Sequence, residues 1–135
     1  MEDFSTKTIE QHVNFPCTAA QFYQDFMDSE AHSAIIGAPT EISGEIGGQF
    51  SAFDGYCHGE NLELIPGQRI VQTWIAEQDN WPEGHVSKII LELQAIEEGV
   101  SLRFVHENVP LDAADGIAQG WYDFYWNNMQ QRYSA

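Results

Sequence analysis

Basic side chains are scarce in this 135-residue chain. It carries 5 lysines and arginines against 21 aspartates and glutamates, which gives a formal net charge of −16. Binding to a phosphate backbone requires clustered Lys and Arg that displace counterions, and the basic residues here are scattered. The composition therefore argues against nucleic acid and anionic membrane as partners. The acidic balance favours solubility, and it would also suit a basic protein partner.

Cysteine and long apolar runs are also rare. Cys17 and Cys57 are too few for a disulfide scaffold, and whether they form a bridge depends on geometry that the sequence does not supply. No apolar stretch approaches the length of a membrane span. The first residues lack the basic and apolar regions of a signal peptide. We therefore expect a cytoplasmic protein with reduced thiols and no membrane insertion.

Catalytic signatures are missing as well. The chain has no nucleophile elbow, no P-loop, no dinucleotide fingerprint and no compact zinc motif of the His-Glu-x-x-His type. The glycine-rich stretch 44–48 lacks the spacing of a phosphate-binding loop and is read as a turn. We expect no metal and no cofactor, and we assign no catalytic residue.

The residues that are present indicate one folded domain spanning 1–135. Hydrophobic residues make up 43% of the chain and aromatic residues 13%, as in globular proteins. Residues 5–15 alternate and are β-branched, which predicts a strand with Gln11 on its apolar face. Thr18 and Gln21 match a capping box and predict a helix start. Asp28 or Ser29 is expected to cap a second short helix that ends at Gly37.

The middle of the chain, from 40 to 108, is predicted to be a meander of strands. Alternation and turn residues place the strands at 40–44, 48–54, 57–65, 69–76, 86–96 and 100–107. The final segment, 112–133, has apolar residues at helical spacing and predicts one long helix with Asp112 as its N-cap. Gly116 and Gly120 weaken a helix, which we explain by close approach to another layer.

This order of elements, together with several short motifs, resembles the START-like superfamily. The motifs are Gly48-Gln-Phe50, Asp54-Gly55, Leu64-Ile-Pro66-Gly67-Gln-Arg69, Thr73-Trp74, His106-Glu-Asn-Val109-Pro110 and Gly120-Trp121. More narrowly, the chain resembles the domain named for the activator of the ninety-kilodalton heat-shock protein ATPase. The resemblance covers nearly the whole chain. It implies an α+β helix-grip fold, in which a curved antiparallel sheet of six to seven strands encloses a cavity against the C-terminal helix.

Candidate site residues follow from the strand pattern and the resemblance. His58, Glu60 and His106 fall on strand faces shared with leucines, so we expect them to point into the concave interior. A larger set of aromatic side chains is expected to line the cavity: Phe26, Phe53, Trp74, Trp121, Phe124 and Tyr125. The loop at Trp81 is interpreted either as a cover for the cavity mouth or as an ordinary turn.

Three functions remain open from the sequence. The leading one is binding of an apolar or amphipathic small molecule, because aromatic residues outnumber any catalytic set. The second is co-chaperone-like binding to the heat-shock protein, which the narrower resemblance implies. The third is a cyclase or dehydratase that uses Glu60, His58 or His106 as acid or base. An edge strand of such a sheet can pair with a second copy, so either a monomer or a homodimer is expected.

Overall fold

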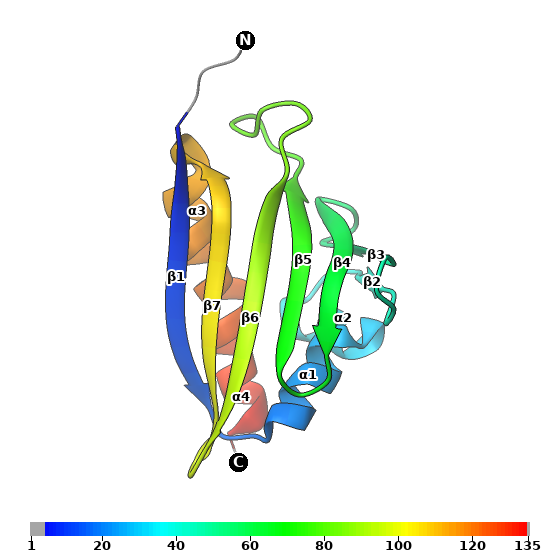
Figure 1. Ribbon diagram of the computed structural model, residues 1–135, viewed down its shortest axis with the longest axis vertical. Coiled ribbons are helices and arrows are strands. Elements are labelled where there is room, and N and C mark those ends of the chain that lie inside the picture. The colour runs from blue at the N-terminus through cyan, green and yellow to red at the C-terminus, as the bar shows by residue number, and fades with distance from the viewer. Residues whose placement is uncertain (1–4, 135) are drawn as a thin grey trace.

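Seven antiparallel strands form the sheet of the computed structural model, which describes residues 5–134. Their order across the sheet is β1-β7-β6-β5-β4-β3-β2. The bounds are β1 Thr6–Phe15, β2 Glu41–Ile42, β3 Gln49–Ala52, β4 Cys57–Ile65, β5 Arg69–Ala76, β6 Ser87–Ile96 and β7 Gly99–Pro110. The helices pack on one side of the curved sheet, with the C-terminal helix behind β1, β7 and β6 (Figure 1). The α+β helix-grip architecture predicted from the sequence is confirmed.

Two short helices follow β1, as predicted: α1 Ala19–Met27 and α2 Ser29–Ile36. The Thr18 hydroxyl caps α1 by accepting a 3.0 Å hydrogen bond from the Gln21 N–H. The predicted capping box is only half formed, because the Gln21 side chain donates to Asp25 instead of returning to the cap. The Asp28 carboxylate caps α2, and Gly37 ends it with a left-handed φ of 73°.

The C-terminal segment differs from the single α-helix that was predicted. It comprises α3 Leu111–Gly120, a π-helix η1 Trp121–Trp126, and α4 Asn127–Tyr133. The N-cap is Pro110, which has no side-chain hydrogen bond to offer, and Asp112 lies in the first turn. The expectation of Asp112 as cap was therefore wrong. In a π-helix each N–H bonds to the carbonyl five residues back. Tyr125 and Trp126, four and five residues after Trp121, therefore both lie near Trp121.

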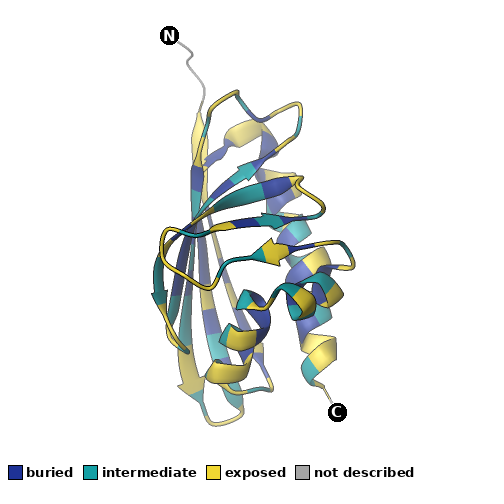
Figure 2. Cartoon of the chain, turned by 90° about the vertical axis from the view of Figure 1, so that its right-hand side faces the viewer, coloured by how far each residue is buried: buried dark blue, intermediate teal, exposed yellow. Residues whose placement is uncertain are grey.

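The core fills the space between this helix and the concave face of the sheet, where buried residues face one another (Figure 2). The largest fully buried side chains include Trp126, Phe15, Phe22, Phe104 and Met129. Trp126 has ring partners on β1, α1 and β7, with centroid distances of 6.2 Å to Phe15, 6.5 Å to Phe22 and 5.2 Å to Phe104. The sheet and two helices therefore meet on one indole.

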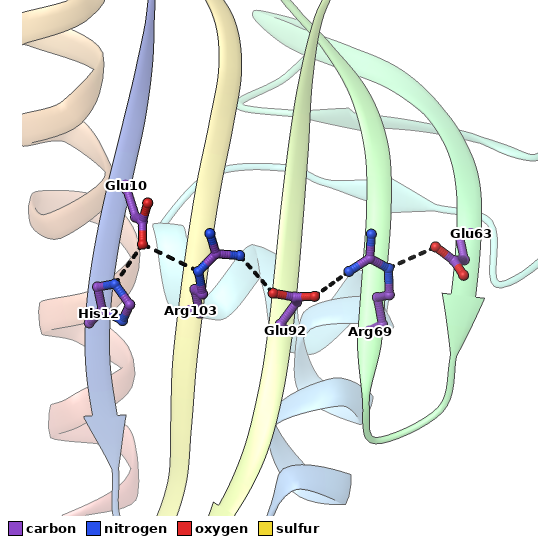
Figure 3. A network of polar contacts seen from close by, with 6 residues as sticks. All are labelled: Glu10, His12, Glu63, Arg69, Glu92 and Arg103. Carbon is purple, nitrogen blue, oxygen red and sulfur yellow. Dashed lines mark hydrogen bonds and ion pairs between the residues drawn. The ribbon is translucent and has the colours of Figure 1, made fainter.

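The outer face of the sheet carries a ladder of ion pairs that crosses five strands (Figure 3). Arg103 on β7 pairs with Glu10 on β1 and with Glu92 on β6. Arg69 on β5 pairs with the same Glu92 and with Glu63 on β4. The Arg103 Nη1 to Glu92 Oε1 distance is 2.8 Å, and His12 adds a 2.8 Å contact to Glu10. This ladder places two of the chain's few cations on the side of the sheet away from the helices. None of the helices in residues 5–134 is both long and apolar enough to cross a bilayer.

Candidate ligand-binding cleft

A cleft of about 730 Å³ lies between the C-terminal helix and the loops at the ends of β3, β4 and β5. Ligand pockets in proteins span roughly 300 to 1,000 Å³, so the space suits a small molecule. Its lining combines aromatic, small and polar side chains: Ala38, Phe53, Tyr56, Cys57, Trp74, Gln78, Asn80, Asp112, Ala113, Gly116, Ile117, Gly120, Trp121, Phe124 and Tyr125. The cleft therefore offers an apolar wall and a polar rim.

The helix contributes one continuous stripe to the cleft. Asp112, Gly116, Gly120 and Phe124 recur every four residues and all line it. Among residues 5–134, and apart from its chain neighbours and its own helix backbone, a Cβ built on Gly116 would meet no atom within 4 Å, and one on Gly120 would meet only the Phe124 ring at 3.9 Å. The expectation that the helix packs closely on another layer at these two glycines is therefore wrong. They leave bare backbone facing the cleft.

Aromatic rings form the apolar wall. The Trp74 and Trp121 ring centroids lie 5.8 Å apart, and Trp121 and Tyr125 lie 4.7 Å apart. Phe53 meets Phe124 edge-to-face at 5.4 Å, and Phe124 is 47% exposed. Such geometry is favoured by the ring quadrupoles. The wall is fixed at its inner end and open to solvent at Phe124.

The π-helix explains how the wall is held. Trp121, Tyr125 and Trp126 are all buried, and each donates its polar hydrogen to a different element. The Trp121 indole donates to His106 Nδ1 at 3.2 Å, the Tyr125 hydroxyl to His32 Nε2 at 2.7 Å, and the Trp126 indole to Gln11 Oε1 at 2.7 Å. These hydrogen bonds attach Trp121 to β7 and Tyr125 to α2, and they attach the adjacent Trp126 to β1.

His106 is completely buried on β7, so its predicted inward direction is confirmed. Its Nδ1 accepts from Trp121, which leaves Nε2 to donate to the Ser87 hydroxyl at 2.9 Å. Ser87 in turn donates to the carbonyl of Trp74. Burial lowers the pKa of His106 to about 3, so the ring is neutral at physiological pH. His106 lies behind the wall and holds Trp121; it does not line the cleft.

His32 is the corresponding support on α2, and the sequence reasoning missed it. Its Nδ1 donates to the Phe26 carbonyl at 2.7 Å and its Nε2 accepts from Tyr125. Burial lowers its pKa to about 4, so it too is neutral at physiological pH. The signal was present, because His32 shares helical spacing with the buried Ile35 and Ile36. Phe26 packs on His32 with centroids 4.8 Å apart and does not reach the cleft.

His58 and Glu60 do not point into the interior, contrary to the sequence expectation. His58 is half-exposed and pairs with Glu77, with 2.8 Å between Nε2 and Oε2, and Glu60 is exposed. The pairing register of β4 shifts between Asn61 and Glu63. Such a bulge reverses the inward and outward alternation. Before it, Cys57 and Asn61 face inward, so extrapolating back from Leu64 gave the wrong face.

The polar rim is a chain of hydrogen bonds joining three segments. The Tyr56 hydroxyl donates to the Gln78 side-chain carbonyl, and Gln78 donates to the Asn80 carbonyl oxygen. Asn80 then donates to the Asp112 backbone carbonyl at 3.1 Å. These rim residues were not predicted, because loop polar residues carry no periodicity that marks them.

The turn that presents Phe53 has an unusual backbone. Phe53 and Asp54 have φ of 54° and 57°, and Gly55 has φ of 92°. Bulky residues avoid the left-handed region, which costs on the order of 1–3 kcal/mol. The Asp54 N–H donates to the Pro39 carbonyl at 2.9 Å and ties the turn to the segment after α2. The backbone is therefore strained at Phe53 and Asp54, beside the cleft that Phe53 lines.

The remaining candidate groups offer little reactivity. Cys17 and Cys57 are free thiols, and burial raises their pKa values to about 11 and about 12. Cys57 lines the cleft as a protonated, weakly nucleophilic thiol. Within residues 5–134, no group of three or more His, Cys, Asp or Glu is arranged to hold a metal ion. Trp81 is buried, packs edge-on against Trp74 at 5.6 Å, and lies outside the cleft lining.

Comparison with known proteins decides the family. The sequence profile described as Activator of Hsp90 ATPase homolog 1-like protein matches residues 16–133. The chain belongs to this family. It is 29% identical over 118 residues to the activator of 90 kDa heat shock protein ATPase homolog of Dictyostelium discoideum, covering 87% of this chain and 30% of that protein. It is 28% identical over 116 residues to homolog 2 of Mus musculus, covering 84% and 34%.

The family member described here thus spans about a third of the length of these curated relatives. Among solved structures, it resembles an HSP90 activator from Plasmodium falciparum with a TM-score of 0.84 and 22% identity, over 93% of this chain and 94% of that one. At this identity the likeness supports the fold alone.

Proposed function

We propose that this Hsp90 ATPase activator-like chain binds an apolar or amphipathic small molecule in the cleft between its C-terminal helix and sheet. The observation that carries the proposal is the stripe of Gly116 and Gly120, which leaves an aromatic-walled space of about 730 Å³ unfilled. Each of these helical glycines costs about 1 kcal/mol against alanine. Packing against residues 5–134 does not require a glycine at position 116. We therefore attribute the glycine to the cleft, which a larger side chain would fill.

The same geometry favours binding over catalysis. The two buried histidines, His32 and His106, are neutral and have both ring nitrogens engaged by protein groups. General acid–base catalysis needs a group within reach of the reacting atom and a pKa near the working pH. The third function, a cyclase or dehydratase using His58, Glu60 or His106, therefore receives no support from their positions.

Calorimetric titration with 1-decanol tests the proposal. Gly116→Leu places a side chain in the cleft, and Gln119→Leu adds the same side chain to an exposed position of α3 outside the lining. We expect the wild type and Gln119→Leu to bind alike, and Gly116→Leu to bind at least about tenfold more weakly. Equal binding by the two leucine variants would place the ligand elsewhere, and absence of binding to the wild type would count against the proposal.

Binding to a ninety-kilodalton heat-shock protein is the second candidate function. It rests on the profile match and on the likeness to the Dictyostelium and mouse activator homologues. The net charge of −16 would favour a basic patch on the partner. The test is the ATPase rate of that chaperone with and without this chain, at low and at moderate salt. Stimulation that weakens with salt supports this function, and an unchanged rate without binding contradicts it.

A further inference from the structure

The cleft is electrically one-sided. Its lining contains one side chain that is charged at neutral pH, the carboxylate of Asp112. Asp112 is exposed at the first turn of α3, and no ion pair or hydrogen bond from residues 5–134 engages its carboxylate. A carboxylate at the rim of an aromatic cleft, without a protein cation beside it, is an unpaired negative charge that a cationic ligand can neutralise.

The chain's cations are committed elsewhere. Arg69 and Arg103 belong to the outer ladder (Figure 3). Lys88 pairs with Glu107, with 3.6 Å between Nζ and Oε1, and Arg132 pairs with Asp25, with 3.4 Å between Nε and Oδ2. Lys7 lies on β1, outside the lining. No basic residue is therefore available in the lining to receive an anionic head group such as a carboxylate or phosphate.

We infer that the cleft selects amphiphiles whose polar head is a cationic ammonium group. This inference deepens the proposed function and depends on it. The head would lie at the Asp112 end, near the neutral Gln78 and Asn80, and the apolar body would run along the glycine stripe toward Phe124. At 1.5 Å per helical residue, that stripe is roughly 15–18 Å long.

Two physical effects add to the same preference. The Asp112 carboxylate attracts a cation and repels an anion, and the −16 net charge of the chain has the same sign. The Tyr56 ring is 42% exposed in the same rim, and the negative side of its quadrupole lies on the ring faces, which attract ammonium groups. An anionic amphiphile would meet repulsion on both counts.

The test uses three ligands with the same ten-carbon chain: decyltrimethylammonium, 1-decanol and decanoate. They are titrated below their micelle concentrations into the full chain at about 150 mM salt, where charges beyond roughly 8 Å are screened. We expect decyltrimethylammonium to bind about tenfold more tightly than decanoate, with 1-decanol between them.

Two variants with the same net charge separate the site from general attraction. Asp112→Asn should weaken decyltrimethylammonium about three- to fivefold and 1-decanol by less than about twofold, because only the first ligand carries a charge. Glu97→Gln, in the turn between β6 and β7 at the opposite end of the sheet from α3 (Figure 1), should leave both unchanged.

Equal affinities for the three ligands, or equal losses in the two variants, would overturn the cation preference while leaving the proposed binding function intact. If none of the three binds, the proposed function fails, and the inference fails with it.

Discussion

The two ends of the C-terminal helix are packed in opposite ways. From Trp126 to the end of α4, Trp126 and Met129 are fully buried, and Trp126 packs against Phe15 and Phe22. From α3 to Phe124 of η1, one face packs on the core through Ala113 and Ala114, and the other, with the exposed Gly116 and Phe124, faces a cleft. One continuous helix thus has a closed end that contributes stability and an open end that leaves stabilising contacts unmade. The difference shows where packing alone dictates the residues and where another requirement competes with it.

The largest effect is expected at the closed end. Trp126→Ala removes a fully buried indole that contacts three other elements, which should lower the free energy of unfolding by about 3–5 kcal/mol. Phe124→Ala, at the open end, removes a ring that is 47% exposed and should cost under about 1 kcal/mol while weakening 1-decanol. Urea unfolding of both variants measures the contrast. Similar losses would mean that the two ends are packed alike.

The second effect concerns the histidines that hold the wall. In the unfolded chain, His32 and His106 have the ordinary histidine pKa of 6.5 and bind protons below that pH. In the native protein their pKa values are about 4 and about 3. The free energy of unfolding should therefore fall as the pH drops from 6.5, by about 1.4 kcal/mol per pH unit for each histidine. For His32 the loss continues to about pH 4.

Urea unfolding at pH values between 7 and 5 measures this slope. His106→Asn cannot titrate and should reduce the slope by about half, after correction for its lower stability at pH 7. An unchanged slope in His106→Asn would show that His106 does not resist protonation in the native state.

The third effect is a gain in stability at the open end. Gly116→Ala should raise the free energy of unfolding by up to about 1 kcal/mol, because alanine favours a helix and its Cβ meets nothing within 4 Å. Gly59→Ala should instead be strongly destabilising, since its Cβ would lie 1.9 Å from the Thr73 carbonyl oxygen. Thermal unfolding separates the two. A loss of stability in Gly116→Ala would indicate that the helix is packed closely there.

The smallest effect is expected on the outer face, which neither end of the helix touches. Glu92→Gln breaks the centre of the ion-pair ladder and should lower the Tm by about 1–4 °C, less at high salt. Binding of 1-decanol should be unchanged. A change in binding would show that the ladder and the cleft are coupled through the sheet.

Much of this arrangement was predictable from the sequence. Alternation placed β4 at 57–65 and β5 at 69–76, which match the observed bounds, and helical spacing located the terminal helix. The aromatic wall at Trp74, Trp121 and Tyr125 was also anticipated. These features depend on local periodicity, which the sequence displays directly.

The rest depends on contacts between distant residues. The bulge in β4 reversed the faces of His58 and Glu60, and no residue type in that strand marks it. The π-helix coincides with the segment whose three large rings, Trp121, Tyr125 and Trp126, are all buried in the core. The His32–Tyr125 pair joins residues 93 positions apart, so neither partner identifies the other in the sequence.

The four tryptophans of the chain form a continuous row of indoles. Trp81 lies 5.6 Å from Trp74, Trp74 lies 5.8 Å from Trp121, and Trp121 lies 5.7 Å from Trp126. At such separations, the electronic transitions of neighbouring indoles couple and excitation passes along the row. The near-ultraviolet circular dichroism of the protein is therefore a collective signal. Because the two middle indoles line the cleft, we expect an occupant of the cleft to change the near-ultraviolet circular dichroism of the whole row, which would serve as a built-in optical reporter.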